Sequence, residues 1–135
     1  MKTSISHLLF NVRSDNVPFY KDLFTFLGWA TLYEGDGMLG LGGANDASVW
    51  FATEIRNVAN DYDGPGMNHL GIGAPAQADI DATVAYLRGK GVELLFDTPR
   101  HRPEFSSEGQ TYYQVMFESP DRILFEVVYM GPTSS

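Results

Sequence analysis

Two histidines and one glutamate are the residues of this sequence best suited to chemistry. His7 and His69 each take the third place in a similar segment, ISHL at 5–8 and MNHL at 67–70. Glu126 interrupts an apolar run (ILFEVV), where an unpaired carboxylate would be costly to bury. Two imidazoles and one carboxylate leave open positions on a divalent metal, and this set suits Fe2+, Mn2+, Ni2+, Co2+ or Zn2+. The three side chains therefore predict a site where a metal acts as a Lewis acid on substrate oxygens.

The two histidine segments open two copies of one module. Each segment begins a predicted strand, which is followed by a helical pattern and then by three strand patterns. We place module one at about 4–55, a polar and turn-rich connector at 56–66, and module two at about 67–130, within a single domain of 135 residues. Pseudo-twofold duplication brings equivalent strands side by side, so His7 and His69 could meet at the axis.

The predicted elements define an α+β fold with largely antiparallel sheets. In module one the helix starts near Pro18 and runs to about Leu27, and Gly28 ends it. The other expected elements are strands at 4–12, 30–34, 38–41 and 48–54, a short strand around His69 within 66–75, a helix at about 77–88, and strands at 92–96, 110–117 and 122–130. Residues 97–109 are expected to be irregular.

Composition excludes several classes of function. The net charge of −8 and the pI of about 4.6 disfavour nucleic acid and anionic membranes as partners. The absence of cysteine excludes disulfides, thiolate metal sites and a cysteine nucleophile. No apolar run is long enough for a signal peptide or a membrane span, so we expect a cytoplasmic protein.

Nearly the whole chain resembles the glyoxalase/bleomycin resistance/extradiol dioxygenase superfamily, also called vicinal oxygen chelate. The segments that carry the resemblance are ISHL (5–8), PFYKDL (18–23), LGW (27–29), NHLGI (68–72), DIDATVAYL (79–87), GKGV (89–92), SPDR (119–122) and FEV (125–127). The resemblance implies two βαβββ modules that form an open, cup-like mixed sheet, usually within a homodimer. It also implies a metal in the cup, with His7, His69 and Glu126 at the positions of its ligands and a small molecule as substrate.

The sequence departs from the family at two positions. Glyoxalase I has a fourth ligand, a glutamate, on the last strand of the first module. We assign that position to Phe51, which would make the cup floor apolar and contact substrate, while Trp50 would point away into packing. The final family hairpin ends in Asp-Gly, whereas this chain has Asp121 and Arg122.

Three functions stay open at this point. The first is a metalloenzyme that acts on a small oxygenated substrate as a lyase, isomerase or ring-cleaving dioxygenase. The second is a metal-free protein of the bleomycin resistance type, which binds an aromatic or cationic drug. The third is a fosfomycin-type thiol transferase, which needs cationic groups for its thiol and phosphonate.

Other candidate residues surround the three predicted ligands. Loop 97–109 could cover the cup mouth, with His101 as a catalytic acid or base beside Glu126. Arg100 and Arg102 could bind an anionic substrate. A simple register for the last hairpin pairs Glu126 with Val115 and makes Tyr113 a wall of the substrate site.

Overall fold

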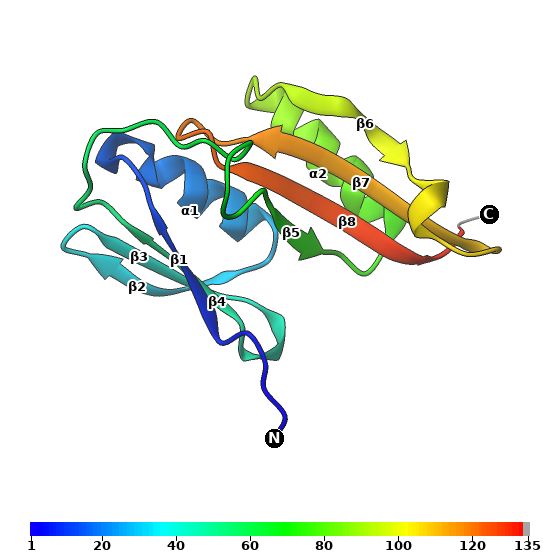
Figure 1. Ribbon diagram of the computed structural model, residues 1–135, viewed down its shortest axis with the longest axis horizontal. Helices are drawn as coiled ribbons and strands as arrows, with labels where there is room; N and C mark the ends of the chain where they lie inside the picture. Colours follow the sequence, from blue (N-terminus) through cyan, green and yellow to red (C-terminus); the bar gives the residue numbers. More distant parts are fainter. Residues whose placement is uncertain (134–135) are drawn as a thin grey trace. The chain divides into compact units, whose positions relative to one another are not determined.

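The computed structural model describes residues 1–133, so the last two residues of the predicted domain lie outside the described part. The chain divides into two compact units, Met1–Ala59 and a second unit that starts at Asn60. Each unit is one four-stranded mixed sheet with one α-helix on it (Figure 1). This arrangement confirms the α+β class and the βαβββ repeat.

The first unit follows the order strand, helix and three strands. Its elements are β1 (His7–Asn11), α1 (Val17–Phe26), β2 (Ala30–Gly35), β3 (Met38–Gly42) and β4 (Ser48–Ala52). The strands lie in the order β1-β4-β3-β2, with β1 parallel to β4 and the other pairs antiparallel.

The second unit repeats this topology. Its elements are β5 (Leu70–Gly73), α2 (Gln77–Gly89), β6 (Leu94–His101), β7 (Gln110–Glu118) and β8 (Leu124–Pro132). The strands lie in the order β5-β8-β7-β6, and β5 is parallel to β8. The prediction that residues 97–109 are irregular was wrong in its first part, because β6 continues to His101 beyond a bulge.

Helix α1 packs on the first sheet through aromatic side chains. Pro18 stands in its first turn, and Gly28, with a φ of 89°, follows its end. Tyr20 and Phe24 are fully buried, and their ring centroids lie 4.4 and 5.7 Å from that of Phe51. Burial of these rings between helix and sheet forms the core of this unit.

The same contacts correct two predictions for β4. Phe51 is fully buried and faces α1, so it is a core residue and contacts no substrate site. Its neighbour Trp50 lies on the opposite face of the sheet, beside the partner residue Leu9 of β1. The sequence pattern misled us because both residues are large and apolar, and alternation alone does not say which face meets the helix.

Helix α2 covers one face of the second sheet, as Figure 1 shows. Its buried residues Ile80, Val84 and Leu87 were predicted to face inward. The rings of Phe117 and Phe125 stack on the same side at 5.7 Å and are fully buried. The even-numbered residues of β7 and β8 therefore face away from α2.

The hairpin between β7 and β8 corrects the predicted register. Glu126 pairs with Met116, not with Val115. The connecting turn is one residue longer than expected, because the Ser119 hydroxyl accepts hydrogen bonds from the backbone N–H groups of Asp121 and Ile123 at 3.2 and 3.1 Å.

Within residues 1–133, none of the helices is long and apolar enough to cross a membrane.

Replacement of Phe51 tests its reassignment to the core. Phe51→Ala should lower the free energy of unfolding by about 3–5 kcal/mol, because it leaves a cavity among the rings of Phe10, Tyr20 and Phe24. Urea denaturation measures this loss. Phe26→Ala, on a helix residue that is 41% exposed, should cost far less. A Phe51→Ala variant of unchanged stability would contradict the assignment.

Candidate metal and substrate site

Glu126 of β8 is the centre of the candidate site in the second unit. Its side chain is 4% exposed and lies on the sheet face that α2 leaves uncovered. The Tyr112 hydroxyl donates to its Oε1 at 2.8 Å, and the Gln114 amide donates to its Oε2. Arg102 Nη1 donates to the Gln114 side-chain oxygen at 3.3 Å, which turns the amide NH2 group toward the carboxylate. The buried charge is thus stabilised by two neutral donors.

His69 stands directly before β5 and faces this carboxylate. Its Nε2 lies 3.9 Å from Glu126 Oε1, and its Nδ1 lies 2.7 Å from the side-chain oxygen of Asn68. Asn68 in turn donates to the backbone oxygen of Tyr62 at 3.2 Å. A Cβ at Gly71 would lie 3.2 Å from Glu126 Oε1, so glycine leaves the carboxylate its room. With Nδ1 as donor to Asn68, Nε2 is the nitrogen available to a ligand.

The connector before His69 is fastened to the β7–β8 hairpin. The Tyr62 hydroxyl donates to Glu118 at 2.5 Å, which raises the pKa of Tyr62. The Arg122 guanidinium lies 4.5 Å from the centre of the Tyr62 ring and 3.2 Å from Asp63. Arg122 has a φ of 58°, so it takes the left-handed conformation at the place where the family pattern has glycine.

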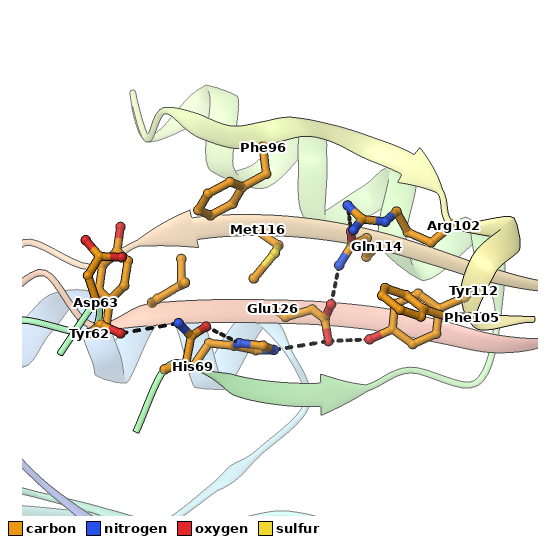
Figure 2. A pocket seen from close by; sticks show the side chains of 12 residues that line it. Tyr62, Asp63, His69, Phe96, Arg102, Phe105, Tyr112, Gln114, Met116 and Glu126 are labelled. Atoms are coloured by element: carbon orange, nitrogen blue, oxygen red, sulfur yellow. Dashed lines mark hydrogen bonds and ion pairs between the residues drawn. The ribbon is translucent and has the colours of Figure 1, made fainter. Parts of the chain in front are cut away.

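These residues surround a hollow of about 650 Å³ (Figure 2). Polar groups gather near Glu126, and most of the remaining wall is apolar, with Asp63 beside Tyr62 at the other end. The lining residues are Tyr62, Asp63, Asn68, His69, Phe96, Arg102, Phe105, Tyr112, Gln114, Met116, Leu124 and Glu126.

Two predicted site residues lie on the other face of this sheet. Tyr113 donates its hydroxyl to Asp81 of α2 at 2.7 Å, so it does not line the hollow around Glu126. His101 stacks on the Tyr113 ring at 4.5 Å, and its Nδ1 lies 2.5 Å from the Thr111 hydroxyl. The two predictions fail for different reasons. A register shift of one residue exchanges the two faces of β7 and turns Tyr113 toward α2, whereas His101 belongs to the continued strand β6 and pairs with Tyr113 instead of lying in a loop over the site.

The two predicted arginines differ in their position relative to the hollow. Arg102 lines the hollow, where its guanidinium lies 2.5 Å from Glu104 and 5.2 Å from the Phe105 ring centre. Arg100 opposes Gln114 in register but is exposed and lies outside the lining. Of the pair, Arg102 is the one placed to meet a bound molecule.

The sequence reasoning predicted only His69, Arg102 and Glu126 among the residues that line this hollow. Of those it missed, Asn68 is bonded to His69, and Tyr112 and Gln114 are bonded to Glu126. Gln114 carried a usable signal, since it is a polar residue within an otherwise apolar part of β7. Its position two residues from Tyr112 would have identified the face that Glu126 shares.

His7 lines a separate hollow of about 460 Å³ in the first unit. The indole N–H of Trp50 donates to the Ser48 hydroxyl at 3.0 Å. A Cβ at Gly40 would collide with three carbons of this indole, so Gly40 lets the ring lie against the sheet. The other lining residues are Leu9 and Met38.

Register identifies Trp50 as the counterpart of Glu126. The residue two places after His7 is Leu9, which pairs with Trp50. The residue two places after His69 is Gly71, which pairs with Glu126. The position that we assigned to Phe51 on sequence therefore belongs to Trp50, whose indole offers no metal-binding atom.

Two of the three predicted ligands come together. His69 and Glu126 share one hollow, while His7 belongs to the first unit, so its meeting with them stays a prediction. Within the described part of the chain, no three His, Cys, Asp or Glu residues form a group that could hold a metal.

Burial raises the pKa of Tyr112 to about 12, and its hydrogen bond to Glu126 adds to this effect. Burial likewise raises the pKa of Tyr113 to about 12, with a further contribution from Asp81. Both hydroxyls keep their protons in neutral solution, so Tyr112 acts on Glu126 as a donor.

These two tyrosines predict how stability depends on alkaline pH. A tyrosine ionises near pH 10 in the unfolded chain, whereas Tyr112 and Tyr113 have pKa values of about 12 in the folded chain. The stabilisation that their protonated hydroxyls give to the fold is therefore complete below about pH 10 and is lost as the pH rises toward 12. We expect the free energy of unfolding to fall across this window. Tyr112→Phe and Tyr113→Phe should each make the decline shallower, and an unchanged slope in both variants would contradict the assignment.

Asn68 should determine the tautomer of His69. Asn68→Ala removes the acceptor for Nδ1–H, so we expect the neutral ring to change from one tautomer to a mixture. Long-range 15N–1H NMR of the imidazole measures this change. Asn60→Ala, which alters a connector amide bonded to the Arg122 backbone, should leave the His69 signals in place.

Comparisons by sequence find no matching family model and no matching curated protein. Comparisons of structure find many related folds. A candidate glyoxalase from Bacillus halodurans matches with a TM-score of 0.76 and 21% identity, over 93% of this chain and 94% of that one. The fosfomycin resistance protein FosX from Listeria monocytogenes matches with a TM-score of 0.67 and 18% identity, over 95% and 91%.

A third match is a glyoxylase/bleomycin resistance protein/dioxygenase domain from Frankia sp. EAN1pec. Its TM-score is 0.66 at 19% identity, and the match covers 100% of this chain and 96% of that one. The chain therefore has the fold of the glyoxalase/bleomycin resistance/dioxygenase proteins, which its sequence motifs predicted.

Proposed function

We propose that this chain is a divalent-metal-dependent enzyme of the vicinal oxygen chelate superfamily that acts on a small oxygenated substrate. The observation that carries the proposal is the pair of His69 and Glu126, whose Nε2 and Oε1 atoms lie 3.9 Å apart in one hollow. His7 is proposed as the third ligand.

The residues present fit a metal. Two ligands that are each about 2.1 Å from a metal are at most about 4.2 Å apart, and the His69–Glu126 separation lies within this limit. Imidazole nitrogen and carboxylate oxygen suit Mn2+, Fe2+, Co2+, Ni2+ and Zn2+. Asn68, Tyr112 and Gln114 already orient the two ligands, as outer partners do in metal sites. When bound, the metal would polarise a substrate oxygen as a Lewis acid.

The remaining residues of the hollow would bind and orient the substrate. Tyr112 and Gln114 fix the Glu126 carboxylate, so it can accept a proton at a defined position. Arg102 offers N–H groups to an anionic or carbonyl oxygen, although Glu104 balances part of its charge. Lyase, isomerase and dioxygenase chemistry all agree with this arrangement.

A relative supports the choice of metal and substrate class. A variant of FosX from Listeria monocytogenes has been solved with Mn(II) and 1S,2S-dihydroxypropylphosphonic acid, and this chain matches it at 18% identity with a TM-score of 0.67. A homodimer and a cytoplasmic location are further proposals that rest on this likeness and on the composition.

Metal binding tests the proposal directly. Purified protein should bind one Mn2+, Fe2+, Co2+, Ni2+ or Zn2+ per chain by calorimetry. His69→Ala and Glu126→Gln should weaken that binding by about 100-fold or more, because each removes a ligand. His7→Ala should weaken it comparably.

His101→Ala is the matched control, because this third histidine lies on the α2 side of the sheet. It should bind metal like the parent protein. Failure to bind any of the five metals would contradict the enzyme and favour the metal-free drug-binding alternative.

A further inference from the structure

Strand β6 contains an unusual bulge beside the proposed site. Its pairing with β7 is regular at Leu95 and resumes at Arg100. Between them Phe96 and Asp97 have φ values of 57° and 56°, a left-handed conformation that residues other than glycine rarely adopt. Two such residues in succession, without a glycine, mark a strained segment.

Thr98 holds the bulge in place. It is 7% exposed, its hydroxyl donates to the Leu95 backbone oxygen at 2.7 Å, and it accepts from the Met116 backbone N–H at 2.9 Å. The bulge is thus hydrogen-bonded to the neighbouring strand, and these bonds fix its shape within the sheet.

The bulge changes the direction of Phe96. Leu95 pairs with Met116, whose side chain lines the hollow, so in a regular strand the next residue would face α2. Phe96 instead lines the hollow, and Figure 2 shows its ring over Met116. Its side chain is 52% exposed, so the strained backbone presents a ring that gains little from burial in the fold itself.

We propose that Phe96, Met116 and Leu124 form an apolar subsite that selects substrates carrying an aromatic substituent. This inference rests on the proposed function, which places the substrate oxygens at His69 and Glu126. A flat ring between Phe96 and the Met116 thioether would gain ring–ring and sulfur–ring contacts, and it would cover the exposed face of Phe96.

Mandelate and lactate test the subsite, because both present a hydroxyl beside a carboxylate and differ in a phenyl against a methyl group. Protein loaded with Mn2+ should bind mandelate about tenfold more tightly than lactate, since the phenyl group buries more apolar area. Phe96→Ala should remove most of this preference and leave lactate binding unchanged. Phe26→Ala should alter neither affinity. Equal preference for mandelate in the parent protein and Phe96→Ala would overturn the proposal.

A second measurement needs no metal. Benzyl alcohol, titrated into metal-free protein, should shift the methyl NMR signals of Met116 and Leu124 in the parent but not in Phe96→Asn, which tolerates the left-handed conformation without the ring. If these shifts occur and no metal binds, the proposed function fails while the subsite stands. If metal binds but the shifts are absent or independent of Phe96, the subsite is wrong and the metal site stands.

Discussion

A carboxylate buried within a β-sheet is the constraint on which the second unit depends. Glu126 is 4% exposed, so its charge needs partners inside the protein. Tyr112 and Gln114 supply them from the adjacent strand, and Arg102 sets the direction of the Gln114 amide. Gly71, which pairs with Glu126, leaves space for the carboxylate, and His69 faces it. This buried polar group restricts which residue types can occupy the positions around it.

The duplicated module shows how one fold can present two different surfaces. Equivalent register positions hold a carboxylate in one sheet and an indole in the other. Glu126 is held by side chains of β7, whereas Trp50 bonds within its own strand to Ser48 and rests against Gly40. The two sheets have the same strand order. The side chains on the sheet face opposite the helix determine the chemistry of each copy. A hollow is present in each unit, lined by a histidine of equivalent position.

Left-handed residues mark the parts of the second unit that shape its hollow. Arg122 takes this conformation in the β7–β8 turn and contacts Tyr62, which is linked through Asn68 to His69. Phe96 takes it in the β6 bulge and faces the hollow. Neither position is glycine, so each side chain adds contacts at the cost of backbone strain. Two separate segments thus carry strained residues whose side chains lie near the same cavity.

The amino-acid sequence by itself determined the module repeat, the α+β class, both helices and the equivalence of His7 and His69, because hydrophobic period and turn residues are local signals. Only the tertiary structure decided which faces of β4 and β7 carry the candidate sites. Phe51 and Trp50 are both apolar, so the alternation pattern did not say which of them faces the helix. On β7 the polar Gln114 did mark one face, but the assumed turn length paired Glu126 with the other face. A register shift of one residue moved Tyr113 to the helix side and revealed Tyr112 and Gln114, since strand register depends on pairing between distant segments and on turn length. His101 came to the same side because β6 continues through it and pairs it with Tyr113.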